Sequence, residues 1–99
     1  MIIYEVNLSI SKAIKDSFKV WLKDHAESMI TFPGFLRFFI YEISSKEQNT
    51  FNLCVHYYIE SEFYLEKYFI NNADKMRQEG LNLFGNNFSA TRRILSLWD

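Results

Sequence analysis

The chain has 99 residues, of which 48% are hydrophobic and 18% are aromatic. A chain of this length can bury one hydrophobic core without disulfides or metals, and its composition excludes an intrinsically disordered segment. The net charge of -1 and the isoelectric point near 6.1 disfavour nucleic acids and anionic membranes as partners. Both of those partners require clustered lysine and arginine.

The cysteine content and the N-terminal residues indicate a reducing compartment. Cys54 is the single cysteine, so no intrachain disulfide can form. Residues 1–5 lack the basic and apolar regions of a signal peptide, and no apolar run approaches the roughly 18 residues that a membrane span requires. We therefore expect a cytoplasmic protein that forms one domain over residues 1–99 and does not enter a membrane.

The first third of the chain predicts a strand followed by a helix. Apolar and polar residues alternate over Ile2–Ser9, which is the period of a half-buried strand. Ser11 can cap a helix that runs to about Ile30, because apolar side chains recur there every three or four residues. Pro33 and Gly34 end this helix, since proline lacks the backbone donor and glycine permits turn conformations.

The rest of the chain predicts a hairpin, a second helix and a last strand. Phe35–Ser44 and Thr50–Ile59 are rich in β-branched and aromatic residues and are joined by a loop of hairpin length. The second helix is expected from Ser61 to Gly80, and the last strand over Phe88–Trp98. The order β-α-β-β-α-β predicts a ferredoxin-like α+β fold, with both helices on one face of a four-stranded antiparallel sheet.

The second predicted strand is apolar on both of its faces. Strict alternation puts Phe35, Phe39, Tyr41 and Ile43 on one side and Leu36, Phe38 and Ile40 on the other. The helices cover only one side of the sheet, so a bare face of roughly 400 to 500 Å² remains, near the largest apolar patch that a monomer tolerates. We therefore predict a homodimer in which a second copy covers this face.

Several segments together resemble an uncharacterised bacterial family. They are the first strand and residues 31–35 (TFPGF), 60–61 (ES), 65–68 (LEKY), 73 (A), 76–77 (MR), 79–80 (EG), 84–85 (FG), 88 (F) and 90–95 (ATRRIL). The family is a domain of unknown function within the dimeric α/β-barrel superfamily, and the resemblance covers nearly the whole chain. It implies two ferredoxin-like sheets packed face to face, as predicted above.

The resemblance leaves the activity open, because the superfamily includes cofactor-independent monooxygenases, haem-degrading enzymes, lactone isomerases and stress-induced proteins. The favoured interpretation is a small binding or structural module without a catalytic site. The alternative is a cofactor-independent, monooxygenase-like enzyme that acts on a small apolar or aromatic substrate between the helices and the sheet. Phe18, Trp21, Phe38 and Phe69 could line such a pocket or fill it.

The two histidines are the side chains that titrate near neutrality without a large shift. His25 lies on the apolar stripe of the first helix and resembles a helix-one histidine of several dimeric barrels, but a packing role is favoured. His56 lies in the third strand, where a cross-strand pair is favoured. Arg37, Arg92 and Arg93 are further candidates for binding a ligand.

Glu5 is a candidate because it lies in the middle of an apolar strand. In a ferredoxin-like sheet the first strand lies between the third and the fourth, so Glu5 should meet His56 and either Arg92 or Arg93. A buried carboxylate needs such partners, since an isolated charge is costly to desolvate. An ion-pair network that fixes strand register at the dimer interface is favoured over a ligand or proton-transfer site.

No cofactor and no metal are expected. The histidines and Cys54 lie in separate elements without close ligand spacing, and Cys54 is interpreted as a small buried hydrophobe. Haem-degrading relatives place an axial histidine on the second helix, but residues 62–79 contain none. Asn7 matches their strand-one asparagine, and Met76 is interpreted as core. RNA binding is disfavoured because the third strand lacks glycine, lysine and arginine.

Overall fold

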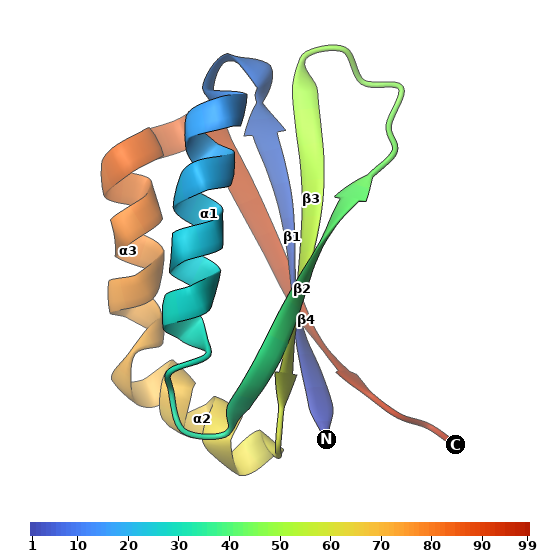
Figure 1. The fold of residues 1–99 in the computed structure, drawn as a ribbon, viewed down its shortest axis with the longest axis vertical. Helices are drawn as coiled ribbons and strands as arrows, with labels where there is room; N and C mark the ends of the chain where they lie inside the picture. The colour runs from blue at the N-terminus through green and yellow to red at the C-terminus, as the bar shows by residue number, and fades with distance from the viewer.

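The structure, a computed structural model, describes all residues 1–99 and confirms the ferredoxin-like fold (Figure 1). Its antiparallel sheet has the order β2-β3-β1-β4. The strands are β1 (Ile2–Ser11), β2 (Phe35–Ile43), β3 (Thr50–Ile59) and β4 (Phe88–Ser96). The helices are α1 (Lys15–Met29), α2 (Glu62–Asn71) and α3 (Ala73–Phe84), with short 3-10 turns η1 (Lys12–Ile14) and η2 (Gly85–Asn87). None of these helices is long and apolar enough to cross a membrane.

The helices cover one face of the sheet and leave the other face bare (Figure 1). Along β1, Ile2, Tyr4, Leu8 and Ile10 are buried under the helices. Successive side chains of a strand point to opposite faces, so Glu5 and its odd-numbered neighbours lie on the bare face. We call this bare side the open face.

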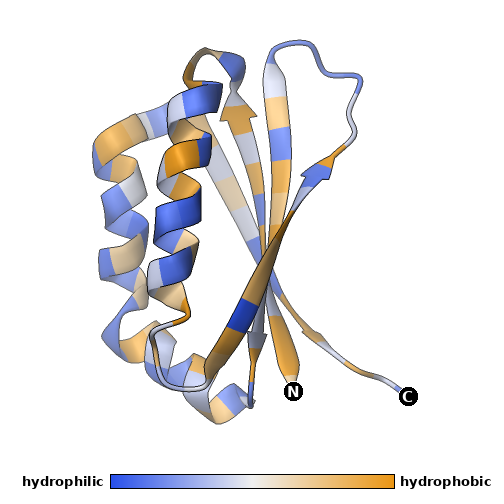
Figure 2. Ribbon diagram, viewed as in Figure 1, coloured by the Kyte–Doolittle hydropathy of each residue, from blue (hydrophilic) through white to orange (hydrophobic).

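The apolar stripe of α1 packs on the sheet as its spacing predicts. Phe18, Leu22 and Met29 are buried, and Phe18 contacts the ring of Phe88 in β4 at a centroid distance of 5.1 Å. Figure 2 shows apolar and polar residues alternating along α1 and α3, as expected for helices with one buried side. Each fully buried side chain of this size contributes about 1.5–3 kcal/mol, so this packing fixes α1 against the sheet.

A β-bulge at the start of β2 changes the predicted faces of that strand. The pairing of β2 with β3 shifts between Phe35 and Arg37, which leaves Leu36 as the extra residue. Phe35 is therefore only 5% exposed and lies on the helix-covered face, while Phe39 stays on the open face. The prediction that Phe35 and Phe39 share a face was wrong, because the inserted residue shifts the alternation of the side chains by one position.

The second helix is two helices, and it continues beyond its predicted end. Asn72, with φ -135° and ψ -23°, separates α2 from α3, and Gly80 lies inside α3. A Cβ atom at Gly80 would lie 2.9 Å from Trp21 and 3.2 Å from Phe88. Gly80 is needed for close packing, and the helix ends instead at Gly85, whose φ is +56°.

Smaller differences occur at other element ends. The Ser11 hydroxyl accepts a hydrogen bond from the Ala13 amide at 3.4 Å, so it caps the 3-10 turn η1, and α1 begins later, at Lys15. Ser61 precedes α2 without a side-chain capping bond. The last strand ends at Ser96, two residues before Trp98, and the tail projects away from the sheet (Figure 1).

Candidate functional site

A cavity of about 260 Å³ lies between the sheet and helices α1 and α3. Hydrophobic residues make up 13 of its 17 lining residues, including Trp21, Leu22, Met29, Met76, Leu81 and Phe88. Phe18 does not line it and is fully buried in the packed core. Among the four aromatic residues predicted to line or fill a pocket, Trp21 is the one that lines this cavity.

The polar groups of this cavity are cations, hydroxyls and one imidazole. The Arg77 guanidinium donates a hydrogen bond from Nη2 to the Tyr4 hydroxyl at 3.1 Å, and its buried Nε has no partner. Arg92 of β4 also lines the cavity, with the side chains of Tyr57 and Tyr68. No aspartate or glutamate lines it, so the field inside favours an anion.

His25 contributes an imidazole to the same wall. Its side chain is 13% exposed and stacks on Trp21 with ring centroids 4.5 Å apart. Its buried Nδ1 makes no hydrogen bond, because the nearest carboxylate oxygen, on Glu79, is 3.9 Å away. Burial lowers the pKa of His25, with the Glu79 carboxylate opposing and Arg92 adding to the shift. The imidazole is therefore neutral near pH 7.

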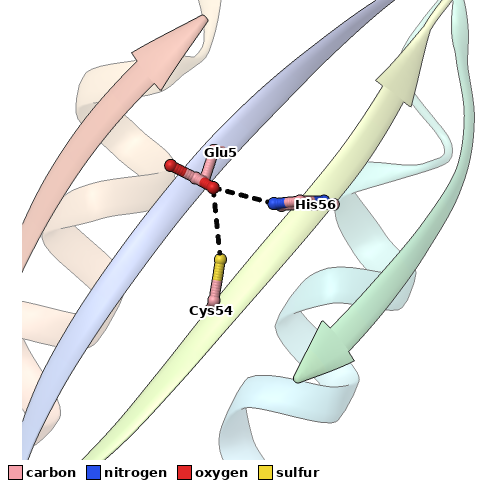
Figure 3. A group of neighbouring side chains, drawn as sticks. All are labelled: Glu5, Cys54 and His56. Atoms are coloured by element: carbon pink, nitrogen blue, oxygen red, sulfur yellow. Dashed lines mark hydrogen bonds and ion pairs between the residues drawn. The ribbon is translucent and has the colours of Figure 1, made fainter. Parts of the chain in front are cut away.

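A second polar group of residues lies on the open face, centred on Glu5. The Glu5 side chain is only 6% exposed, although no helix covers this side. Its Oε1 lies 2.8 Å from His56 Nε2 and 3.6 Å from Cys54 Sγ (Figure 3). Its Oε2 accepts hydrogen bonds from Arg93 Nε and, at 3.0 Å, from Asn7 Nδ2. We call these five residues the Glu5 cluster.

The predicted meeting of Glu5 with His56 and an arginine is confirmed by the strand register. Glu5 pairs with His56 on β3 and with Arg93 on β4. The sequence left Arg92 and Arg93 as equal choices, and alternation sends Arg92 to the cavity side. Arg37 joins neither site, because its guanidinium lies over the Tyr58 ring at 4.6 Å.

The contacts within the Glu5 cluster shift the pKa values of Glu5 and Cys54 in opposite directions. The hydrogen bond from Arg93 lowers the pKa of Glu5 to about 2 against the opposing effect of burial, and His56 and Asn7 assist. Burial, together with the nearby Glu5 carboxylate, raises the pKa of the Cys54 thiol to about 11. The thiol is therefore protonated at neutral pH.

The prediction that Cys54 and the histidines lie in separate elements was wrong for His56, and it missed the contact of Cys54 with this cluster. Cys54 and His56 are two residues apart on β3 and so share one face, and Cys54 pairs with Asn7 on β1. The i, i+2 spacing of Cys54 and His56 within one strand was the signal that could have found the contact.

The neutral His25 makes stability depend on pH. An unfolded histidine takes up a proton near pH 6.5, whereas burial keeps His25 neutral to lower pH in the folded chain. Below about pH 6.5 the unfolded state then binds more protons than the folded state. The free energy of unfolding therefore falls as the pH falls below this value, by at most about 1.4 kcal/mol per pH unit, and His25 causes no such loss above it. Urea unfolding of wild type and His25→Gln between neutral and mildly acidic pH should show the larger loss in wild type. Parallel losses in both proteins would contradict the assignment.

Solved structures share this fold at low sequence identity. A candidate antibiotic biosynthesis monooxygenase from Deinococcus radiodurans has a TM-score of 0.75 and 13% identity, over 100% of this chain and 94% of that chain. SnoaB, a cofactor-independent oxygenase from Streptomyces nogalater, has a TM-score of 0.68 and 10% identity, over 99% and 94%. The haem-degrading MhuD from Mycobacterium tuberculosis, with two haems in its active site, has a TM-score of 0.63 and 14% identity, over 98% and 96%.

These similarities show the ferredoxin-like fold and leave the activity open. No curated protein sequence matches the chain. The sequence model of the family described as Domain of unknown function (DUF4286) matches residues 1–98. Because this match spans almost the whole chain, the protein belongs to the DUF4286 family.

Proposed function

We propose that this protein is a homodimeric binding protein for a small aromatic anion, held in the cavity between the helices and the sheet. The observation that carries the proposal is the composition of the cavity wall. The wall is largely apolar and aromatic, it presents Arg77 and Arg92, and it contains no carboxylate. Apolar walls with a few placed polar groups are typical of small-molecule sites.

The size of the cavity limits the ligand. A cavity of about 150 Å³ already accommodates benzene, and ligand sites for larger molecules begin at roughly 300 Å³. The cavity of about 260 Å³ therefore suits one or two fused rings with a small substituent. Trp21 offers a ring to stack on, and the arginines offer donors to a carboxylate or phenolate.

The open face supports assembly with a second copy. Apolar side chains of β2 remain half exposed there, including Phe39 at 48% and Tyr41 at 47%. The Glu5 carboxylate is already fully paired within its own chain, so covering it leaves no unpaired charge. The sheet face alone is smaller than the roughly 800 Å² per partner of a standard interface. The exposed tail residues Leu97 and Trp98 would enlarge the contact.

The dimer is tested by placing a charge on the open face. Phe39→Asp should give a monomer, because a carboxylate placed against the partner's apolar side chains is costly to desolvate. Val20→Asp, on the exposed outer side of α1, is the matched control and should leave the dimer intact. Sedimentation at micromolar concentration distinguishes the 11.9 kDa chain from twice that mass. A dimeric Phe39→Asp protein, or a monomeric wild type, would contradict the proposed assembly.

The ligand class is tested with naphthoate and its neutral analogue, naphthalene methanol. Arg77→Met should weaken naphthoate binding at least tenfold, because a hydrogen bond to a charged group contributes about 1.5–3 kcal/mol. Arg37→Met removes an arginine from the opposite face and should leave the affinity unchanged. Calorimetric titration measures both. Equal binding of the acid and the alcohol, or an unchanged affinity in Arg77→Met, would exclude an anion site at Arg77.

A second candidate function is cofactor-independent oxygenation, which is favoured by the neutral, unpartnered imidazole of His25 on the cavity wall. His25 would take a proton from a phenolic substrate, and the resulting anion would react directly with dioxygen. One oxygen atom would enter the product as a carbonyl and the other would leave as water. The oxygenase SnoaB, of the same fold, makes this chemistry worth testing.

Oxygen uptake with dihydroxynaphthalene tests this second function. His25→Gln should lower the rate by about a hundredfold or more, since a positioned general base contributes roughly 10² to 10⁴. Gln78→Ala, on the exposed outer side of α3, should match wild type. Uptake no faster than in buffer, or equal rates in wild type and His25→Gln, would leave the protein as a binding module.

A further inference from the structure

We propose that Glu5, Cys54 and His56 form a site for a single transition-metal ion of the Zn²⁺ type on the open face of the sheet. One carboxylate oxygen, one thiol sulfur and one imidazole nitrogen lie within 4.8 Å of one another. They come from two neighbouring strands, with Cys54 and His56 on β3 and Glu5 opposite them on β1 (Figure 3). This site lies across the sheet from the cavity and does not depend on the ligand proposed there.

The contacts of Glu5 Oε1 bring three possible ligand atoms close together. In the metal-free chain both His56 Nε2 and Cys54 Sγ approach Oε1, at 2.8 Å and 3.6 Å. A cation that replaces the protons in these two contacts would bind oxygen, nitrogen and sulfur at once. The thiol then loses its proton to solvent as the metal–sulfur bond forms. The imidazole binds the ion through Nε2 with its one remaining proton on Nδ1, so the proton that Nε2 donated to Glu5 moves to Nδ1 or leaves to solvent.

The second carboxylate oxygen is held by residues that would support the ligands. Oε2 accepts hydrogen bonds from Arg93 Nε and Asn7 Nδ2, so Glu5 can offer Oε1 to the ion without breaking these bonds. Such hydrogen bonds to ligating carboxylates orient them and increase metal affinity. The ring of His56 is also positioned by an edge contact with Tyr41, at a centroid distance of 5.4 Å.

The donor set indicates the class of metal. A thiolate, an imidazole and a carboxylate suit Zn²⁺ and Co²⁺, whereas Mg²⁺ and Ca²⁺ prefer oxygen ligands alone. The carboxylate and the thiolate each bring a negative charge to the ion, and Arg93 stays paired with Oε2 of the carboxylate. Three protein ligands leave a fourth position of a tetrahedral site for water or for a group of a second copy.

The sequence did not predict this site because metal-binding motifs are recognised by close spacing along the chain. Glu5 and Cys54 are 49 residues apart and meet only through the pairing of β1 with β3. The pairing of the strands therefore brings together ligands that are far apart in the sequence.

Titration of the reduced, metal-free dimer or monomer with Co²⁺ under anaerobic conditions tests the proposal. We expect one Co²⁺ per chain, a thiolate-to-cobalt charge-transfer band in the near ultraviolet and ligand-field bands of four-coordinate intensity, all removed by excess Zn²⁺. Cys54 is the single cysteine, so a thiolate band in the wild-type spectrum can come only from its sulfur. Cys54→Ser should lose the charge-transfer band, and Arg93→Met should bind about tenfold more weakly through loss of its support of Glu5.

The two histidines provide matched variants. His56→Gln should lower the Co²⁺ affinity at least tenfold, in line with the loss caused even by supporting residues. His25→Gln, on the opposite face, should keep the wild-type spectrum and affinity. Thermal unfolding without metal shows whether each variant folds, and Zn²⁺ should raise the Tm of wild type. No thiolate band in wild type, one ion per two chains, or equal affinities of wild type and folded His56→Gln would overturn the site.

Discussion

The structure depends on the pairing of β1 with a neighbour on each side. β1 pairs with β3 from Ile2 to Ser11 and with β4 from Ile2 to Ile10, so its register fixes which residues of three strands face each other. Tyr4 and Glu5 are consecutive, yet Tyr4 contacts the cavity and Glu5 lies on the open face. A slip of one residue would exchange them, so both candidate sites depend on one register.

Local periodicity and topology were enough to predict much of this arrangement. The boundaries of β3 were predicted residue for residue, because Thr50–Ile59 carries continuous β-forming side chains between polar ends. The contact of Glu5 with His56 followed from the central place of β1, since antiparallel neighbours of similar length meet at their midpoints. The sequence could not decide which arginine meets Glu5, because an uncertainty of one residue in the register is enough to exchange Arg92 and Arg93.

The features that the sequence did not predict depend on contacts between distant elements. The bulge at Leu36 and the position of Gly80 within α3 depend on how neighbouring elements pack, and local propensity describes neither. A cavity cannot be predicted from composition, because the same aromatic residues can fill a core or surround a void. Phe18 and Trp21 are one turn apart on α1, yet only Trp21 lines the cavity.

The sheet separates two chemical environments. Cations and an unpartnered imidazole face the cavity, and their charges have no carboxylate among the lining residues to neutralise them. On the open face the Glu5 carboxylate is surrounded by donors, so its charge is fully used within the chain. The unneutralised cations of the helix side therefore favour an anion there, whereas the carboxylate of the open face already has its partners, so the two faces of the sheet differ in their electrostatics.

The bulge in β2 also affects how copies of this chain can meet. β2 and β4 are the edge strands, and an edge invites further strands when it offers an unbroken row of amide and carbonyl groups. The β2 edge is interrupted at Leu36 beside the charge of Arg37, and β4 carries Arg92 and Arg93. Growth of the sheet from edge to edge is therefore disfavoured. In the proposed dimer, association through the open face would end after two copies, so it would not lead to open-ended fibres.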